Sequence, residues 1–566
     1  MKKSLFLCLL ALILISCNDK KATKDQAEAT TEEQDFYHNP ILAGWYPDPA
    51  ITDDGKGNYY MVHSTFAFYP GIPIFHSTDL VNWKQIGHVL DRPEQLDLEG
   101  FGVSRAIFAP DISYDGERFY VTCTVVDGKG NFVVTADDPA GPWSDPVWLP
   151  EVIGIDPGLF FDEDKSYLVY NSDAPENKPL YQGHRTIRMV EFDKENLEVV
   201  SDNRILVNGG VDLSEKPIWA EGPRIYKLNG YYYLMTAEGG TAIDHSEVIY
   251  RTKDINTDFE PWDQNPILTQ RDLDPSRENP ITSAGHADIV QTENGEWYGV
   301  FLACRDYGTD HYNTGRETFM TPVRWEDDWP VFDLGGDGVK YKYPLPEGVT
   351  VNEDNFPLTG NFTVKEEFDT DSLGYHWMYL RTVHEPWHSF EDGALQVETR
   401  PEDLAGTSNP SFIGRRQQHL NGSASISLDF IAQSENESAG LVAFQNESYY
   451  YYICKSLQEG EQVVQLRKAN SDGYTIVESA ALEAAEEAVE LKIDFGTDAY
   501  TFSFRTAEDT WQQLGEGLDP KYLSMQVAGG FVGVTLAMYT SSEGEASDNT
   551  ASFNWFEYVG DDEVFE

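Results

Sequence analysis

The sequence predicts an all-β protein in which a five-bladed β-propeller precedes a β-sandwich. A strand-like pattern recurs five times in the first part of the chain, a second short element precedes each copy, and the later strands show no such recurrence. The 566 residues can form more than one hydrophobic core, because single cores stop growing at about 250–300 residues. We expect the propeller over residues 36–345, a linker over 346–361 and the sandwich over 362–566.

The first 35 residues have the character of an export segment rather than of the fold. Two lysines precede an apolar run at 5–15, which is shorter than the roughly 20 residues that a bilayer span requires. The run ends in Leu-Ile-Ser-Cys, which resembles a bacterial lipobox with Cys17 as the acylated residue; the alternative is an ordinary signal peptide. We therefore expect a signal at 1–17, a flexible tether at 18–35, and a protein that is exported and held by lipid in the bacterial cell envelope, facing the periplasm or the surface.

The net charge limits the classes of molecule that this protein can bind. The chain has 40 Lys and Arg against 96 Asp and Glu, a formal charge of −56, which argues against binding nucleic acid or other polyanions. A neutral partner fits best.

Outside the signal, Cys123, Cys304 and Cys454 are widely spaced and show no metal-binding spacing, so we expect buried thiols within strands and no disulfide framework.

The recurring pattern consists of a polar residue, aromatic residues and alternating apolar residues. Such alternation after a turn residue predicts a strand. Copies that begin 49 to 65 residues apart predict units of about four strands, which is the size of a propeller blade. The alternative from this pattern alone is a β-sandwich with coincidental turns. The five copies lie at 57–65, 116–126, 165–172, 230–240 and 295–304.

Ionisable residues recur ahead of these copies. Asp48, Asp156, Glu221 and His286 each stand nine residues before the start of a copy, whereas Asp111 stands five residues before the second copy. In a propeller, the strand before such a hairpin is the innermost of its blade, and equivalent positions of different blades surround the axis at one end. Taken singly, each residue has an ordinary explanation, such as an Asp that shapes a turn before Pro. The shared offset instead predicts that three carboxylates and an imidazole meet.

Carboxylates around a sugar-sized cavity are typical of glycoside hydrolysis. One carboxyl group must be protonated so that it can donate to the leaving oxygen, and another must be ionised so that it can activate water or attack carbon. Crowding of acids raises the pKa of at least one of them, because like charges disfavour ionisation. A neutral sugar is not repelled by the negative charge of the protein. A neutral oligosaccharide is therefore the expected partner.

The motifs resemble those of glycoside hydrolase family 43, the five-bladed propeller enzymes that include β-xylosidases and α-L-arabinofuranosidases. A further segment at 64–87, STFAFYPGIPIFHSTDLVNWKQIG, is similar to the xylosidase-type subgroup. The resemblance extends from about residue 36 to residue 560. It rests on NPILAGWYPDPAI (39–51), GIDPGLFFD (154–162), IWAEGPRIYKLNGYYYL (218–234), GHADIV (285–290) and GRETFMTPVRWEDDWP (315–330).

The resemblance implies catalytic roles. Asp48 matches the general base, Glu221 the general acid, and Asp156 the third acid, which orients the proton donor and tunes its pKa. The family is inverting, so the carboxyl groups of Asp48 and Glu221 are expected about 6.5–9.5 Å apart, which leaves space for the attacking water.

The resemblance also implies the substrate contacts. Arg316 would hold sugar hydroxyls, His286 would lie at the channel floor, and Phe66 and Phe108 would contact the substrate. Two departures stand out: Phe108 occupies a position where many members have Trp, and Arg224 replaces the His usually seen after Glu-Gly-Pro. Some members hold Ca²⁺ or another divalent cation near the His286 position, but no motif in this sequence enforces a metal. We expect no required cofactor; the alternative is a divalent cation such as Ca²⁺ at His286.

The C-terminal part shows strands and turns without an acid at a fixed offset, which suits a sandwich or jelly roll. Segments 381–390 and 411–419 resemble the C-terminal β-sandwich of the xylosidase-type subgroup, in which one loop closes the active-site pocket and limits attack to chain ends. The alternative is a free carbohydrate-binding module. The expected strands lie at 423–433, 438–446, 448–456, 489–496, 499–506, 529–540 and 552–560.

The main functional hypothesis is an exo-acting, inverting hydrolase that releases xylose from the ends of β-1,4-xylo-oligosaccharides. The first alternative is an α-L-arabinofuranosidase that removes arabinose from arabinoxylan or arabinan. An alternative of another class is a non-catalytic sugar-binding propeller lipoprotein, which would be expected to lack Asp48 or Glu221; both are present. A retaining fructan hydrolase is disfavoured, because its Asn-Asp-Pro-Asn-type motif is absent from the sequence.

Overall fold

The computed structural model describes residues 36–352, 354–482, 488–506 and 510–566. The predicted signal at 1–17, its Cys17 and the tether at 18–35 lie outside these residues. The regular secondary structure of the described chain is almost entirely β, with one short α-helix, α1 (Met525–Ala528), and 3-10 turns at Pro175–Asn177, Leu213–Glu215, Pro520–Leu523 and Glu563–Phe565. No helix in this part of the chain combines the length and apolarity needed to cross a membrane.

Five antiparallel sheets form the propeller. Each contains a long central pair of strands that corresponds to one copy of the recurring pattern and its neighbour. The first blade has β2 (Ala50–Asp53), β3 (Tyr59–Val62), β5 (Gly71–Ser77) and β6 (Lys84–Leu90). The second has β7 (Ala106–Ile107), β8 (Asp111–Tyr114), β9 (Phe119–Val126), β10 (Gly130–Ala136) and β11 (Val147–Trp148). The third has β12 (Ile155–Asp162), β13 (Lys165–Asp173), β14 (Arg185–Asp193), β15 (Glu198–Val199) and β16 (Arg204–Asn208). The fourth has β17 (Glu221–Leu228), β18 (Tyr231–Glu238), β19 (Ser246–Thr252), β20 (Glu260–Pro261) and β21 (Leu268–Thr269). The fifth has β22 (Ile281–Gln291), β23 (Trp297–Arg305), β24 (Glu317–Glu326) and β25 (Trp329–Phe332).

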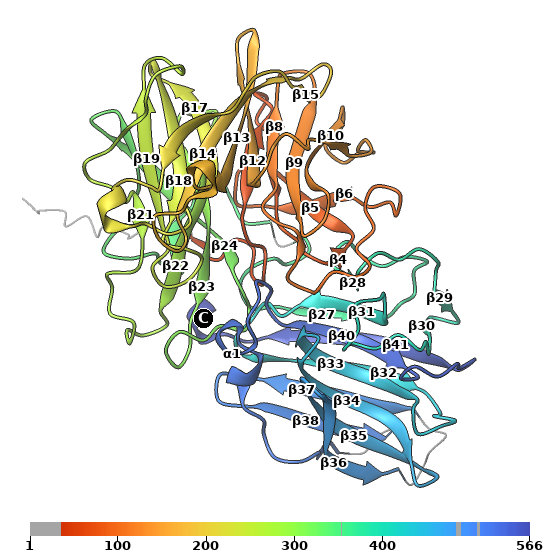
Figure 1. The fold of residues 1–566 in the computed structure, drawn as a ribbon. Helices are drawn as coiled ribbons and strands as arrows, with labels where there is room; N and C mark the ends of the chain where they lie inside the picture. Colours follow the sequence, from red (N-terminus) through yellow and green to blue (C-terminus); the bar gives the residue numbers. More distant parts are fainter. Residues whose placement is uncertain (1–35, 353, 483–487, 507–509) are drawn as a thin grey trace, which may run out of the picture. The chain divides into compact units, whose positions relative to one another are not determined.

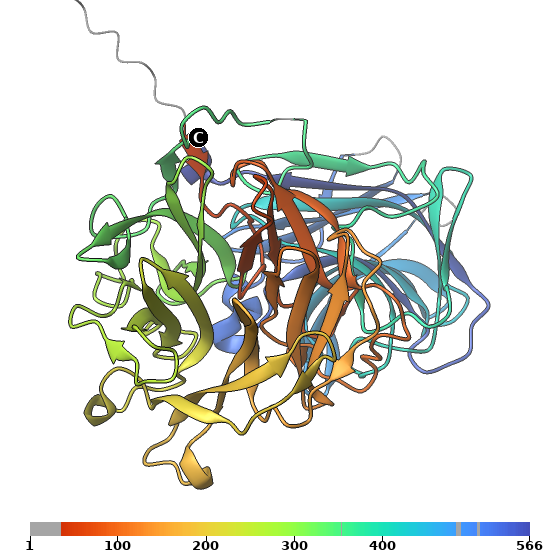
Figure 2. The ribbon, with the colours of Figure 1, turned by 90° about the horizontal axis from the view of Figure 1, so that it is seen from above.

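The innermost strands close into a ring. Strands β2, β8, β12, β17 and β22 lie at one edge of their sheets, and contacts run from β2 to β8, β12, β17 and β22 and back to β2. Figure 2 shows the five sheets following one another around a common centre. The predicted order, in which the element before each copy is innermost, is therefore confirmed. Strand β1 (Phe36–His38) pairs with β26 (Lys342–Pro344), so the two ends of the propeller segment are joined by hydrogen bonds.

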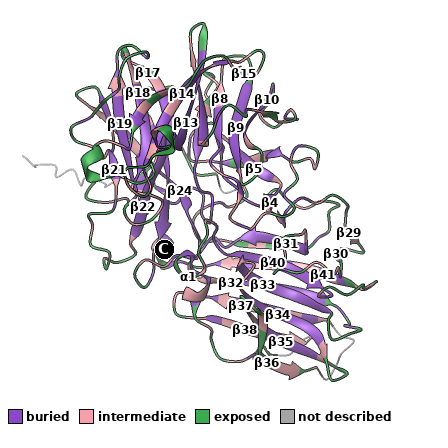
Figure 3. Ribbon diagram, viewed as in Figure 1, coloured by how far each residue is buried: buried purple, intermediate pink, exposed green. Residues whose placement is uncertain are grey.

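Two packed sheets form the sandwich. The first has the order β29 (His388–Glu391), β30 (Ala394–Glu398), β41 (Thr550–Gly560), β32 (Gly422–Asp429), β37 (Val489–Phe495), β38 (Tyr500–Thr506) and β39 (Gln512–Gln513), with β27 (Thr363–Glu366) also on β41. The second has the order β31 (Ser411–Arg416), β40 (Thr535–Ser541), β33 (Ser438–Asn446), β34 (Tyr449–Gln458), β35 (Glu461–Asn470) and β36 (Gly473–Ala481). Their facing sides bury a continuous apolar core. In Figure 3 the central strands β33 and β34 are coloured mainly as buried.

One expected strand of the sandwich is shorter than predicted. The run at 529–540 was expected to be a strand throughout, but only its second half belongs to β40, and residues 529–534 form a connection after α1. Gly529, Gly530 and Gly533 interrupt the side-chain alternation there, and the first two have φ of 75° and 87°, which an extended strand does not accommodate. The three cysteines are buried and free within β9, β23 and β34, as expected.

The propeller and the sandwich pack together over a mixed core. Trp45, Phe66 and Phe68 of the propeller belong to the same buried cluster as Met378 and Phe412 of the sandwich. A two-stranded ladder joins β4 (Phe68–Tyr69) to β28 (Tyr379–Leu380), the only ladder between the two domains in the described chain (Figure 1). The shared core fixes the sandwich against the face of the propeller that carries Phe66.

A buried ion-pair network also joins the two domains. Arg305 of β23 binds Glu317 of β24 at 2.7 Å and Asp562, which follows β41, at 2.7 Å. The same Glu317 accepts a hydrogen bond from the backbone of Gly44 at 2.6 Å. Because each buried charge has an opposite charge and hydrogen-bond partners, removal of one member would leave an uncompensated charge in the interface.

Candidate active site

The predicted ionisable residues lie at one end of the innermost strands. Glu221 is the first residue of β17, Asp156 the second residue of β12, and Asp48 stands two residues before β2, while His286 lies within β22. All four side chains are buried. Electrostatic interactions couple Asp48 to Asp156, Glu221 and His286, so the structure brings together the four residues that share one sequence offset.

A repeated backbone distortion turns these side chains out of the normal strand alternation. Asp48, Asp156 and His286 have φ of 56°, 55° and 51°, a left-handed conformation that side-chain-bearing residues seldom adopt. In β12, β17 and β22 the ladder register shifts at the same place, so a bulge accompanies each distortion. Such strain persists where the surrounding structure holds it, and it gathers at functional sites.

Gly222 is the corresponding left-handed residue of β17. Its φ is 57°, and a Cβ added there would lie 2.9 Å from the ring of His286. The glycine therefore lets the strand that carries Glu221 pass directly over His286. Its backbone N–H donates to Asp156 Oδ2 at 3.1 Å, which links the third and fourth blades within the site.

Asp48 is held as a carboxylate. Arg316 Nη1 donates to Asp48 Oδ1 at 2.9 Å, and the Ser64 hydroxyl donates to Oδ2 at 2.6 Å. Burial by itself would raise the pKa of Asp48, but the Arg316 charge and the Ser64 hydrogen bond outweigh it and keep the pKa below its usual value. At neutral pH this side chain is therefore ionised.

Glu221 and Asp156 show the opposite behaviour. Burial, followed by the charges of Asp156 and Asp48, raises the pKa of Glu221 well above its usual value. Burial and the Asp48 charge raise the pKa of Asp156 to about 7, although the Gly222 N–H opposes this rise. The site therefore holds one carboxylate that stays ionised and one carboxyl group that keeps its proton.

Three phenylalanines lie against one another beside Arg316. The ring centroids of Phe66 and Phe108 are 5.6 Å apart, those of Phe66 and Phe531 are 6.0 Å apart, and those of Phe108 and Phe531 are 5.6 Å apart. The Arg316 guanidinium lies 5.4 Å from the ring of Phe531. Phe66 and Phe108 were predicted from the sequence, whereas Phe531 belongs to the sandwich and was not.

The loop that carries Phe531 is anchored to the propeller. The Phe531 backbone N–H donates to the Ser104 hydroxyl at 2.9 Å, and Val534 N–H donates to the carbonyl of Asn313 at 2.7 Å. A Cβ added to Gly315, which has a φ of +75°, would lie 2.7 Å from the backbone nitrogen of Gly533. This close approach of two backbones, next to Arg316, places a sandwich side chain at the propeller site.

An ion-pair cluster that the sequence analysis did not predict lies further along the innermost strands. Arg224 Nε lies 3.0 Å from Asp111 Oδ1 and 3.7 Å from Asp288 Oδ2, so one guanidinium connects β17 with β8 and β22. Tyr226 donates to Asp288 at 2.5 Å. These residues line a cavity of about 230 Å³ at the propeller centre. The shifted offset of Asp111 and the departure at Arg224 were the sequence signals for this cluster.

The donor groups around His286 do not fit a divalent cation. Calcium binds six to eight oxygen ligands, yet within the described residues His286 belongs to no trio of His, Cys, Asp or Glu with ligand atoms within 4.8 Å of one another. Burial lowers the pKa of His286 to about 3, so the imidazole is neutral. Of the residues next to His286, Gly222 offers only backbone atoms, and Arg224 carries a positive charge, which does not bind a cation.

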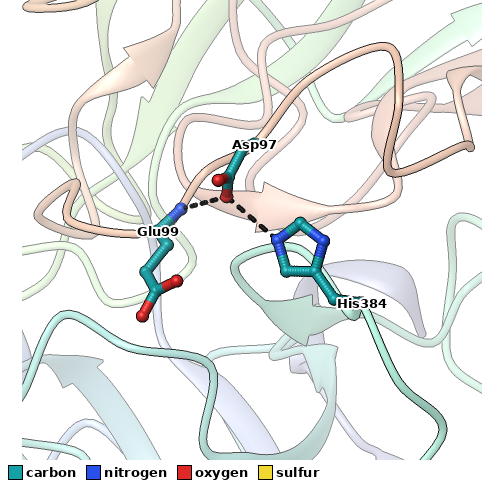
Figure 4. Close-up of side chains that lie close together, drawn as sticks. All are labelled: Asp97, Glu99 and His384. Carbon is teal, nitrogen blue, oxygen red and sulfur yellow. Dashed lines mark hydrogen bonds and ion pairs between the residues drawn. The ribbon is translucent and has the colours of Figure 1, made fainter.

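Outside this site, the described chain contains one trio of such ligands, Asp97, Glu99 and His384 (Figure 4). Asp97 Oδ1 accepts a hydrogen bond from the Glu99 backbone at 3.0 Å and lies 3.2 Å from His384 Nε2. All three residues are exposed, and the Glu99 carboxylate points away from the other two side chains. We assign no ligand to this group.

Comparison with known proteins gives the same assignment for both parts of the chain. The model for glycosyl hydrolases family 43 matches residues 37–330, and that for the β-xylosidase C-terminal concanavalin A-like domain matches residues 365–559. A non-reducing end α-L-arabinofuranosidase of Bacteroides ovatus is 37% identical over 93% of this chain and 95% of its own length. A xylosidase/arabinosidase of Butyrivibrio fibrisolvens is 36% identical over 92% of this chain and 98% of its own.

Solved structures agree. The crystal structure of a protein described as GH43_12, from a capybara gut metagenome, has a TM-score of 0.84 and 40% identity over 90% of this chain and 95% of its own. A xylan β-1,4-xylosidase from Bacillus halodurans has a TM-score of 0.83 and 30% identity over 92% of this chain and 100% of its own. The chain therefore belongs to glycoside hydrolase family 43, and it is a glycosidase with a five-bladed propeller and a C-terminal sandwich.

Proposed function

We propose that this protein is an exo-acting, inverting glycoside hydrolase that releases xylose from the non-reducing ends of β-1,4-xylo-oligosaccharides. The observation that carries the proposal is the meeting of two buried carboxyl groups in different surroundings: Asp48 accepts hydrogen bonds from Arg316 and Ser64, which lower its pKa, whereas burial and neighbouring acids raise the pKa of Glu221. A water-mediated displacement needs one group in each state at the same pH.

In this mechanism Asp48 is the general base. It takes a proton from a water molecule whose oxygen bonds to the anomeric carbon. Glu221 gives its proton to the glycosidic oxygen as the bond from that oxygen to the anomeric carbon breaks. The sugar leaves with inverted configuration, and solvent returns the two carboxyl groups to their starting protonation states. Asp156 supports the acid, because its charge contributes to the raised pKa of Glu221.

Substrate binding is assigned to the phenylalanines and to Arg316. The half-buried rings of Phe108 and Phe531 supply apolar surface for one sugar ring, and the buried ring of Phe66 packs behind them. The buried Nε of Arg316 has no hydrogen-bond partner within the described residues, and it is available to a sugar hydroxyl. His286 is neutral and forms part of the floor. The position of Phe531, which the sandwich brings against Phe66 beside the site, supports attack at chain ends rather than within chains.

A second candidate is an α-L-arabinofuranosidase. It is favoured by the Bacteroides ovatus relative of that name, which covers 93% of this chain. Purified protein should be assayed on a matched pair of aryl β-D-xylopyranoside and aryl α-L-arabinofuranoside. A higher kcat/KM on the xyloside supports the first proposal, and a higher value on the arabinofuranoside replaces it with the second. Proton NMR of the first product anomer checks inversion, and retention would exclude Asp48 as a general base.

Enzymes of this family are generally cofactor-independent glycosidases, and we propose that calcium is not required here either. Dialysis against EDTA should leave kcat/KM unchanged. A loss of activity that added Ca²⁺ restores would contradict this proposal.

We further propose that the protein is lipidated at Cys17 and held in the cell envelope. The Leu-Ile-Ser-Cys motif after a basic start and a short apolar run supports this. Labelled palmitate should be incorporated by the wild-type chain and not by Cys17→Ser. Equal labelling of both would refute the assignment.

A further inference from the structure

An exposed tryptophan lies close to the proposed general acid. Trp219 stands two residues before Glu221, and 41% of its surface is exposed, as is 39% of that of its neighbour Ile218. Adjacent exposed apolar side chains that are rimmed by polar residues can mark a ligand-binding groove. The aromatic and aliphatic surface is therefore continuous in sequence with the start of β17.

The backbone holds this surface in a fixed place. Trp219 N–H donates to the carbonyl of Gly183 at 2.9 Å, and Gly239 N–H donates to the carbonyl of Ile218 at 2.9 Å. The segment is thus bound on one side to the connection before β14 and on the other side to the end of β18. Trp219 also has a φ of 55°, the same left-handed conformation as Asp48 and Asp156. Strained residues that are held by their surroundings cluster at functional sites.

Arg185 connects this surface with the carboxyl groups. Its guanidinium lies 5.1 Å from the centre of the Trp219 ring, and its Nε donates to Asn171 Oδ1 at 2.8 Å. Asn171 pairs in the ladder with Ile155, which precedes Asp156. Burial raises the pKa of Glu221, and the Arg185 charge is among those that oppose the rise, so the guanidinium lies within electrostatic reach of the acid.

We propose that Trp219, backed by Arg185 and flanked by Ile218, binds the leaving part of the substrate, that is, the sugar residues that remain after the terminal sugar is released. This inference rests on the proposed function, because only a hydrolase of oligosaccharides has such a leaving group. The occupant follows from position and chemistry. The proton of Glu221 goes to the oxygen of the leaving sugar, so that sugar lies on the Glu221 side of the bond. A neutral sugar ring presents C–H groups suited to an indole face, and hydroxyl groups suited to Arg185 and to its ion-pair partner Asp173.

The test compares two substrates of the sugar that the wild-type enzyme releases. One is a trisaccharide, and the other is the glycosyl fluoride, whose leaving group is a single atom that cannot reach Trp219. Trp219→Ala should lower kcat/KM on the trisaccharide at least tenfold more than on the fluoride, mainly through a higher KM, and Trp219→Phe should recover most of the loss. Alanine keeps the Cβ and hence the left-handed strain, so the backbone is matched.

Tyr375→Ala serves as a control, because Tyr375 is an exposed aromatic residue (55%) that contacts His88 outside the site. It should have the same kcat/KM as wild type on both substrates. Equal losses on both substrates in Trp219→Ala would overturn the inference and leave the proposed function standing. If the wild-type enzyme cleaves neither substrate, the proposed function itself fails. Thermal unfolding of each variant identifies any change that comes from misfolding.

Discussion

The propeller and the sandwich bury different kinds of side chain. At the propeller axis the buried groups include Asp48, Asp156 and Glu221, each on or beside an innermost strand with a distorted backbone. Between the sheets of the sandwich the core is aliphatic and aromatic. The sandwich reaches the site through Phe531, on a short connection rather than on a strand. In the proposed mechanism, the propeller thus supplies charge and proton transfer, and the sandwich supplies shape.

Replacement of the base in the propeller should have the largest effect. In Asp48→Asn the shape stays nearly constant, but the side chain cannot accept a proton from water. We expect kcat to fall by about 10²–10⁴-fold on every substrate, whatever its leaving group. Steady-state kinetics on aryl glycosides and on disaccharides check this. A loss confined to disaccharides would contradict the assignment of Asp48 as base.

Replacement of the proposed acid should lower kcat/KM to different extents on substrates with poor and good leaving groups. Glu221→Ala removes the proton donor, so kcat/KM on a disaccharide should fall by about 10²-fold or more, and on an activated aryl glycoside much less. The reason is that a good leaving group departs without protonation. Equal losses on both substrates would count against Glu221 as the acid, and Asp48→Asn is the matched comparison.

Replacement of the third acid, Asp156, should change the pH dependence of kcat/KM. Burial and then the Asp156 charge raise the pKa of Glu221, so removal of that charge in Asp156→Asn lowers it. In the proposed mechanism the active form has a protonated Glu221. As the pH rises, the variant should therefore lose activity earlier than the wild type, and the alkaline limb of the kcat/KM profile should move down by about one pH unit. The acidic limb reflects Asp48 and should move less. An unchanged alkaline limb would contradict the coupling.

Replacement of Phe531, the side chain that the sandwich brings to the site, should have the smallest effect on kcat/KM. Phe531→Ala removes one of three packed rings, and aromatic contacts of this kind contribute about 0.5–1.5 kcal/mol, so kcat/KM should fall by about two- to tenfold. Phe531→Leu, which keeps apolar volume, should lose less. A loss as large as that of Asp48→Asn would mean that the sandwich does more than shape the pocket.

The sequence was sufficient for the propeller and for the residues that share an offset. Asp48, Asp156, Glu221 and His286 could be predicted because each blade repeats the same element, and repetition makes equivalent positions meet. The bulges and left-handed φ values that aim these side chains could not be predicted, since most of these positions carry ordinary residues rather than glycine.

Contacts between distant parts of the chain were the main omission. Phe531 lies in a run that alternates like a strand, and only its packing against Phe66 and the close approach of Gly533 to Gly315 reveal its role. The cluster of Arg224, Asp111 and Asp288 joins three blades, and no local pattern encodes such pairing. Both omissions concern tertiary contacts that a periodic pattern does not contain.

The ion pairs of Arg305 have a consequence for biosynthesis. Glu317 directly follows Arg316, and the guanidinium that binds Glu317 also binds Asp562, about 250 positions later in the chain. A ribosome must therefore synthesise the chain as far as Asp562 before Arg305, which binds the residue next to Arg316, has both of its ion-pair partners. A nascent polypeptide with only its blades completed would be an unfinished catalyst.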